Sequence, residues 1–236
     1  MFDEMTYSGL RASTLGVATA MALAFAASPA AASTVDLVFK GAAAGGFESF
    51  TVTEKPEDAS FVGGVAGPFF MEIKGTTEKF VAWCFDLTST LAMGGSGHTY
   101  TQSSSFVTGV DEIAGAGTRV QQLFDAVYDP SLLGDQLQAA AMQVAIWAAI
   151  YDDSLSLDGT FNIAAGDLRD AADDLLKDAA DFSGPQKWVL TYFDAGQGKQ
   201  NIGTVAPIPL PAAGWLLLAG LGALGAAARR QRRKAA

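Results

Sequence analysis

The stretch that decides the fold is Leu137–Tyr151, LQAAAMQVAIWAAIY. From Ala139 to Tyr151 every residue except Gln143 is apolar or aromatic, and this pattern predicts an α-helix that is buried on nearly all sides. A buried amide without partners costs about 1–3 kcal/mol. Gln143 is therefore either fully hydrogen-bonded or used in chemistry.

The single cysteine, Cys84, lies in a second apolar stretch, Phe80–Leu87 (FVAWCFDL). Alternation along a strand would place Phe80 and Cys84 on one face and Trp83 on the other. A thiol and a carboxamide that meet in a dry pocket can lose ammonia and form an internal thioester, which an amine can later attack. From spacing alone the inert-core interpretation is favoured, since free cysteines are among the most often buried residues.

The length of 236 residues allows one domain with appendages at its ends. Near the N-terminus, Arg11 precedes a short apolar run, Leu15–Ala27, and then the small residues SPAAAS. This pattern predicts a secretory signal peptide over residues 1–32, cleaved between Ala32 and Ser33 by signal peptidase. A retained first membrane helix is the alternative, although the run is short for a span.

The C-terminal region predicts a membrane segment. Residues 212–228 are rich in Gly, Ala and Leu and are followed by RRQRRK. An apolar run of this length is at the lower limit for a transmembrane helix, and a basic tail favours a cytoplasmic end. The chain is therefore expected to contact the membrane through this helix.

The region between the two ends is strongly acidic. Arg11 and five basic residues of the tail lie outside residues 33–206, which leaves 9 of the 15 Lys and Arg; two acidic residues lie outside, which leaves 23 of the 25 Asp and Glu. The resulting net charge of −14 repels phosphate backbones and excludes nucleic acid as a partner. With one cysteine, no intrachain disulfide can form.

Residues 33 to about 100 favour strands. STVDLVFK, FESFTVTE, FVGGVAGPFFMEIKG and EKFVAWCFDLTSTL carry β-branched and aromatic clusters, whereas the polar MGGSGHTYTQSSS predicts a loop or a short hairpin. KWVLTYFDA predicts a strand that closes the sheet, and GQGKQNIGTV is either the last strand or a tether.

The middle of the chain favours helices. One is expected from an N-cap at Thr118 to Pro130, a second over Leu137–Tyr151, and a third over Asp167–Phe182 with its carboxylates outward. The prediction is an α+β domain over residues 33–205, a strand-rich sheet or barrel with about three inserted helices. Residues 206–236 then form a tail that contains the transmembrane helix.

Two short motifs resemble bacterial Cys–Gln thioester domains. Phe80–Leu87 is similar to their strand motif of an aromatic residue, Cys, a hydrophobic residue and Asp, and Ala141–Trp147 (AMQVAIW) is similar to their helix motif. The resemblance implies a surface adhesin in which Cys84 and Gln143 form a thioester that captures an amine on a target. Trp83 and Trp147 are most simply core residues, and if the thioester forms they would be its aromatic cover. Asp86 is a candidate to orient or polarise the Cys84 region, with a turn or hydrogen-bond anchor as the alternative.

The tail closely resembles a PEP-CTERM sorting signal of the VPLPA subtype. Its motif stands as Pro209, Leu210, Pro211 and Ala212, with Ile208 where valine is usual, before the apolar helix and the arginines. The resemblance implies export, transient inner-membrane anchoring and processing by an exosortase-type protease in a Gram-negative bacterium. A plain C-terminal anchor is the alternative.

Other chemistry is weakly indicated. His98, the only histidine, could form a Cys–His hydrolase with Cys84, but a histidine in a Gly/Ser-rich loop is more often solvated. The aspartates after Tyr151 lack calcium-loop spacing, so no metal site and no cofactor is expected. The sequence thus predicts a non-enzymatic surface or extracellular-matrix protein with a Cys84–Gln143 thioester, or a structural protein in which both residues are core.

Overall fold

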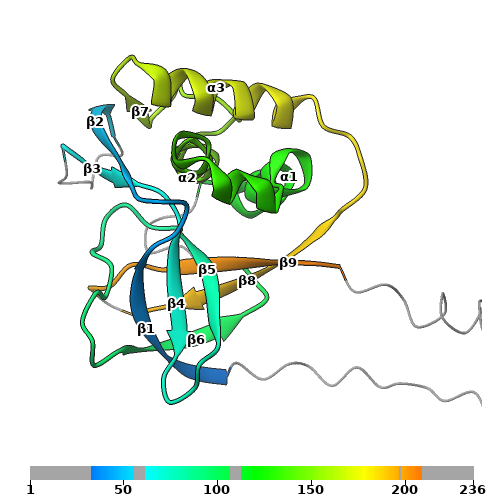
Figure 1. Cartoon of the computed structure of the whole chain (residues 1–236). Helices are drawn as coiled ribbons and strands as arrows, with labels where there is room; N and C mark the ends of the chain where they lie inside the picture. The colour runs from blue at the N-terminus through cyan, green and yellow to red at the C-terminus, as the bar shows by residue number, and fades with distance from the viewer. Residues whose placement is uncertain (1–32, 56–61, 107–112, 197, 209–236) are drawn as a thin grey trace, which may run out of the picture. The chain divides into compact units, whose positions relative to one another are not determined.

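The computed structural model describes residues 33–55, 62–106, 113–196 and 198–208 (Figure 1). These described residues belong to one compact unit. The predicted signal peptide, the Pro209–Ala212 motif and the predicted transmembrane helix over 212–228 lie outside the described residues. Within the described residues, no helix combines the length and the apolar character that crossing a membrane requires.

Six antiparallel strands close into a barrel in the order β1-β4-β5-β9-β8-β6. Because β1 and β9 are both barrel strands, the barrel joins the two ends of the described chain. The strands are β1 (Ser33–Ala42), β4 (Phe69–Ile73), β5 (Lys79–Cys84), β6 (His98–Ser103), β8 (Trp188–Asp194) and β9 (Ile202–Pro207).

Helices and a small sheet occupy the space beside the barrel (Figure 1). Helix α2 contacts α1, α3 and the strands β2 and β3, so it is the centre of this layer. A second sheet has the strand order β3-β2-β7. The elements are β2 (Glu48–Glu54), β3 (Gly63–Ala66), α1 (Ala116–Val127), the 3-10 helix η1 (Pro130–Gly134), α2 (Gln136–Tyr151), β7 (Asn162–Ile163) and α3 (Asp167–Ala180).

Helix α2 confirms the prediction made from its apolar sequence. The Asp135 side chain caps its first turn by accepting from the Gln138 N–H at 3.1 Å, and every residue from Ala139 to Tyr151 is buried. Helices α1 and α3 instead have one apolar face each, with buried positions such as Val120 and Leu176. The α+β class, the barrel and the three α-helices of the described region agree with the predicted fold.

Some predicted strands and boundaries were wrong. The segment expected to be a loop or a hairpin contains β6, a barrel strand between β1 and β8. The stretch FVGGVAGPFFMEIKG is not one strand, because Gly67-Pro68 separates β3 and β4, which belong to different sheets. Helix α1 begins before Thr118, with Gly115 at the N-cap position.

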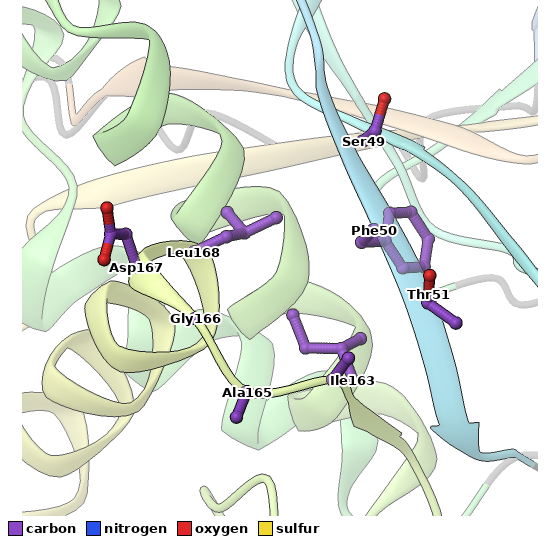
Figure 2. A pocket seen from close by; sticks show the side chains of 9 residues that line it. Ser49, Phe50, Thr51, Ile163, Ala165, Gly166, Asp167 and Leu168 are labelled. Atoms are coloured by element: carbon purple, nitrogen blue, oxygen red, sulfur yellow. The ribbon is translucent and has the colours of Figure 1, made fainter.

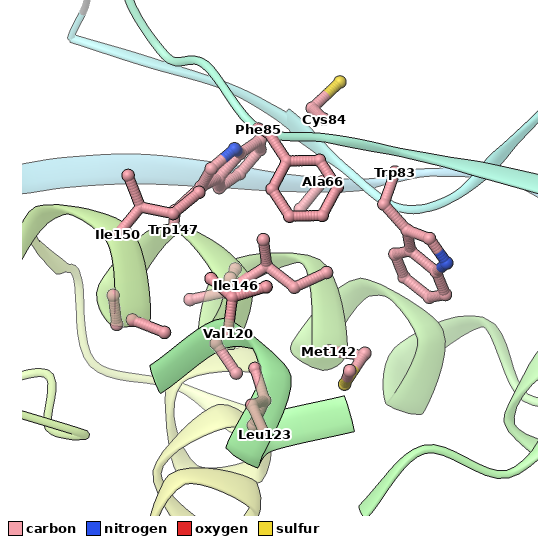
Figure 3. Close-up of a cluster of buried hydrophobic side chains, with 14 of the residues drawn as sticks. Ala66, Trp83, Cys84, Phe85, Val120, Leu123, Met142, Ile146, Trp147 and Ile150 are labelled. Atoms are coloured by element: carbon pink, nitrogen blue, oxygen red, sulfur yellow. The ribbon is translucent and has the colours of Figure 1, made fainter. Parts of the chain in front are cut away.

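The two faces of β5 serve different parts of the core. Phe80 stacks on Phe193 inside the barrel, and Trp83 packs its ring edge-on against Phe124 of α1. Figure 3 shows Trp83 on the helix side of this strand and Cys84 on the opposite side. The predicted alternation therefore places the thiol toward the barrel interior.

Candidate functional site: a buried thiol between two glutamine amides

The backbone of Cys84 is held by the side chain of Gln143. Gln143 Oε1 accepts from the Cys84 N–H at 2.9 Å, and Gln143 Nε2 donates to the Cys84 carbonyl at 2.8 Å. The last β4–β5 partners are Phe69 and Ala82, so Cys84 extends beyond its neighbouring strand. The amide from α2 takes the place that a strand residue would otherwise occupy, and both of its polar groups are paired.

The thiol of Cys84 contacts a different amide, that of Gln200. Cys84 Sγ donates to Gln200 Oε1 at 2.9 Å, and each residue is 8% exposed. Because the carbonyl bond is about 1.23 Å long, the sulfur lies at most about 4 Å from the Gln200 carbonyl carbon. The structure thus brings together a thiol and an electrophilic amide carbon with little access for water.

Gln200 is held through both its backbone N–H and its side-chain amide nitrogen. Its N–H donates to the Thr90 carbonyl at 3.1 Å, and its Nε2 donates to the Asp86 carbonyl. The next residue, Asn201, accepts from the Phe85 N–H at 2.9 Å through its carbonyl and from the Ala195 N–H at 2.8 Å through its side chain. The loop before β9 is therefore fastened to the end of β5, where the thiol lies.

Burial keeps the Cys84 thiol protonated. Desolvation raises the pKa of the thiol far above its ordinary value, and the nearby Asp86 charge raises the pKa further. Burial, followed by the proximity of Cys84, also raises the pKa of Tyr100 to about 12. Reaction at this sulfur consequently requires a route by which its proton can leave.

Asp86 lies next to both reacting groups and is itself fully buried. Its Oδ1 accepts from the Thr88 N–H at 2.6 Å and from the Thr88 hydroxyl at 2.7 Å. Its Oδ2 is buried and has no hydrogen-bond partner among the described residues. The predicted supporting residue is thus at the site, with one carboxylate oxygen unpaired.

The two predicted aromatic residues lie on the helix side of β5. The ring contacts of Trp83 are with Phe124 and Tyr128. Trp147 packs against the rings of Phe50 and Phe161 (Figure 3 labels both tryptophans). Both side chains fill the core between the strands and the helices, and their shielding of a thioester stays a prediction.

His98 is directed to the loop that carries Gln200. Its Nε2 donates to the Ala195 carbonyl at 2.7 Å, and its ring packs edge-on against Tyr100. The thiol hydrogen bond of Cys84 is with Gln200. The histidine therefore supports the loop that positions Gln200, and no Cys84–His98 hydrogen bond is found among the described residues.

Sequence reasoning predicted that Cys84 and Gln143 would meet, and they do, but through the Cys84 backbone. It missed Gln200, which belongs to a polar segment, GQGKQNIGTV, that was assigned to a strand or a tether. The available signal was position: Gln200 comes two residues before the strand that closes the barrel. This position indicates a contact with Cys84 only when the pairing of β5 with β9 is known.

Two surface hollows in the described region lie apart from the thiol. One, of about 320 Å³, lies between β2 and the start of α3 and is lined by Ser49, Phe50, Thr51 and Ile163–Leu168, whose side chains are drawn in Figure 2. A more open hollow of about 430 Å³ lies beside α1 and Phe182. No group of three or more His, Cys, Asp or Glu residues in the described region could hold a metal ion.

Residues 207–233 match the family model of the PEP-CTERM protein-sorting motif. The match includes the predicted Pro209–Ala212 motif, the apolar run and most of the arginine tail. Such a signal implies export and processing by an exosortase. No curated protein matches the sequence.

Among solved structures, the chain is similar to the N-terminal thioester domain of a Clostridium perfringens surface protein. Identity is 14%, the match covers 73% of this chain and 98% of the other, and the TM-score is 0.41. It is also similar to the N-terminal domain of the Streptococcus pyogenes pilus tip adhesin Cpa, with 13% identity, coverage of 69% and 95%, and a TM-score of 0.42.

Proposed function

We propose that this chain is an exported surface protein that stores an internal thioester between Cys84 and Gln200 and uses it to bind amines covalently. The observation that carries the proposal is the 2.9 Å contact between Cys84 Sγ and Gln200 Oε1 inside the protein. The cross-link predicted from sequence, Cys84–Gln143, is replaced by Cys84–Gln200, because both polar groups of Gln143 hold the Cys84 backbone.

The chemistry is a condensation followed by amine capture. Cys84 Sγ bonds to the Gln200 carbonyl carbon, the carbon–nitrogen bond breaks, and the nitrogen leaves as ammonia with the thiol proton. Later an amine attacks the same carbon, the carbon–sulfur bond breaks, and Cys84 regains a proton. Each molecule forms one bond with its target, so the protein acts as a single-use cross-linker and not as an enzyme.

The environment of the pair supports storage of such a bond. Both residues are almost completely buried, so water has little access to the carbonyl carbon. Hydrogen bonds of Gln200 to Thr90 and Asp86 hold its side-chain carbonyl carbon in place. Hydrogen bonds between the Gln143 amide and the Cys84 backbone hold the sulfur in place. Fixed geometry of this kind supplies much of the effective concentration that a reaction between two side chains needs.

The sorting tail gives the proposed location. We infer that the chain is exported in a Gram-negative bacterium, anchored through residues 212–228, and processed near Pro209–Ala212 by an exosortase-type protease. Replacing Pro209 and Pro211 with alanine should leave a longer, membrane-retained species on a blot of cell fractions. Wild-type mature protein that still carries its arginine tail would contradict this part of the proposal.

Intact mass spectrometry tests the thioester directly. The wild-type protein should weigh one ammonia less than its sequence, and methylamine treatment should add one methylamine to that mass. Cys84→Ala and Gln200→Ala should both show the full sequence mass. A wild-type protein of full mass, with a thiol that reacts only after unfolding, would instead favour a structural surface or matrix protein in which Cys84 and Gln200 are hydrogen-bonded core residues.

A further inference from the structure

The thiol–amide pair lacks an evident path for its proton. Thioester formation must remove a proton from Cys84 Sγ and deliver a proton to the departing nitrogen of Gln200. Burial opposes loss of that proton to water, because an isolated buried thiolate is poorly solvated. A proton acceptor inside the protein would resolve both requirements.

Asp86 is positioned to serve as that acceptor. It follows Cys84 by two residues, just beyond the end of β5. It is fully buried, and its charge lies close enough to Cys84 to affect the thiol. The two groups are therefore neighbours in a region from which water is largely excluded.

The two oxygens of the Asp86 carboxylate have different environments. Oδ1 is occupied by the N–H and the hydroxyl of Thr88, which fix the orientation of the carboxylate. Oδ2 is buried without a partner among the described residues. A buried carboxylate oxygen without a partner costs free energy, and its presence in a folded protein calls for an explanation such as a catalytic role.

The leaving group is also anchored at Asp86. Gln200 Nε2 donates to the backbone carbonyl of Asp86, so the nitrogen that would depart as ammonia lies against the same residue. One residue thus lies beside the proton donor and beside the atom that must receive the proton.

We propose that Asp86 Oδ2 accepts the Cys84 thiol proton as sulfur bonds to the Gln200 carbonyl carbon, and then returns that proton to Gln200 nitrogen as the carbon–nitrogen bond breaks. The products are the thioester and one molecule of ammonia, and the carboxylate is regenerated. This inference rests on the proposed thioester function. It gives Asp86 a specific role in forming the bond, beyond orienting the strand.

The test measures the rate of thioester formation. Full-length protein accumulated in an unfolded state, with Gln200 intact, is refolded in detergent, quenched at intervals and weighed. Asp86→Asn keeps the size of the side chain and an oxygen for Thr88, yet it should slow the loss of ammonia by at least about 100-fold, the range typical of a lost general base. Asp125→Asn, a change at another buried carboxylate, is the matched control and should form the thioester at the wild-type rate.

A second readout separates proton transfer from a structural role. In a Gln200→Ala background, where no thioester can form, loss of the Asp86 charge should make Cys84 alkylation by iodoacetamide faster, because a negative neighbour no longer opposes the thiolate. Slower condensation together with faster alkylation supports the proposal. Equal condensation rates in Asp86→Asn and wild type would overturn it.

The failure of this inference can be told from failure of the proposed function. A refolded wild-type chain that never loses ammonia contradicts the thioester itself. A wild-type chain that loses ammonia while Asp86→Asn does so equally fast contradicts the role of Asp86 alone. If Asp86→Asn does not fold, Asp86→Glu and Asp86→Gln replace it, because these two variants are equal in size and differ in charge. Loss of ammonia from Asp86→Gln at the same rate as from Asp86→Glu would then overturn the inference.

Discussion

Gln143 shows how a buried amide can support a candidate reactive site through structure alone. Its two hydrogen bonds complete the backbone pairing of Cys84 where β4 no longer accompanies β5. An asparagine would be too short to span the same gap from α2, and a hydrophobic residue would leave the Cys84 N–H and carbonyl unpaired. The residue therefore helps to fix the position of the sulfur, whereas Gln200 would contribute the carbon in the proposed thioester.

Replacement of Gln143 by alanine tests whether Gln143 is structural and Gln200 forms the cross-link. Gln143→Ala should lower the free energy of unfolding by about 2–5 kcal/mol, because two buried backbone groups lose their partners. The fraction of the variant that folds should still lose one ammonia, whereas Gln200→Ala should not. Urea unfolding and intact mass of the same samples give the two results. A Gln143→Ala protein that folds and keeps its full mass, while Gln200→Ala still loses one ammonia, would return the cross-link to Gln143.

Asp152, at the end of α2, makes the free energy of unfolding depend on pH. It is 1% exposed, its Oδ1 accepts from the Phe161 N–H, and burial raises its pKa to about 6 from 3.8. Because the folded state favours the protonated carboxyl, the free energy of unfolding should fall as pH rises from about 4 to 6, by at most about 1.4 kcal/mol per pH unit, and level off above that.

Asp152→Asn should remove this slope. Urea unfolding at several pH values between 4 and 7 measures it, with Asp135→Asn, a change at an exposed capping residue, as the comparison. Identical pH profiles for wild type and Asp152→Asn would contradict the assignment.

The sequence predicted the residues of this site only in part, for reasons that are physical. Cys84 and Gln143 stand out because each is a polar or reactive group within an apolar run, and such groups need partners. Gln200 lies among glycines and polar residues, where an amide is unremarkable. Its role depends on a contact between residues 116 positions apart, which no local pattern encodes.

Among the elements, the pairing of β5 with β9 determines how close Gln200 lies to Cys84. Gly203 of β9 faces Trp83 in the sheet, and a Cβ atom at Gly203 would lie 2.1 Å from Phe85 Cε2. The close approach of the two strands beside Cys84 thus depends on the absence of a side chain at this position.

Gly203→Ala should destabilise the protein by about 1–3 kcal/mol, because the Phe85 ring or the β9 backbone must move. The same movement should slow thioester formation, since Gln200 lies two residues before β9. Thermal unfolding and intact mass give the two results, and Gly134→Ala, where an added Cβ meets no atom within 4 Å, should behave like wild type. Gly203→Ala with wild-type stability would show that the strands can separate freely.

The elements that were predicted well are those whose apolar period is strong. Helix α2 is continuous, apolar and capped, so its existence followed from sequence to within one residue at its start. Strand β6 was missed because only Tyr100 of its six residues is fully buried, and the others are polar or partly exposed. Its place between β1 and β8 is determined by barrel closure, a property of six strands together.

At the scale of the whole molecule, net charge should select the amine. The net charge of −14 over residues 33–206 attracts cations to the protein. A polycation such as spermidine should therefore react with the proposed thioester faster, relative to neutral hydroxylamine, at low salt than at high salt.

Between about 0.01 M and 1 M salt, where the screening length falls from about 30 Å to 3 Å, the ratio of the two rates should decrease about tenfold or more. Mass spectrometry of the adducts at timed intervals measures both rates. A ratio that does not change with salt would exclude charge as a selector of the target.

The order of strands in the barrel also has a consequence in time. Gln200 and β9 are the last part of the barrel to be synthesised, and the pairing of β9 with β5 is what brings the amide to the thiol. A chain that is still being threaded through the membrane cannot have made this pairing. On the proposed export route, the electrophile would therefore form only after β9 has paired with β5, and the amines it meets would be those on the side of the membrane where the barrel folds.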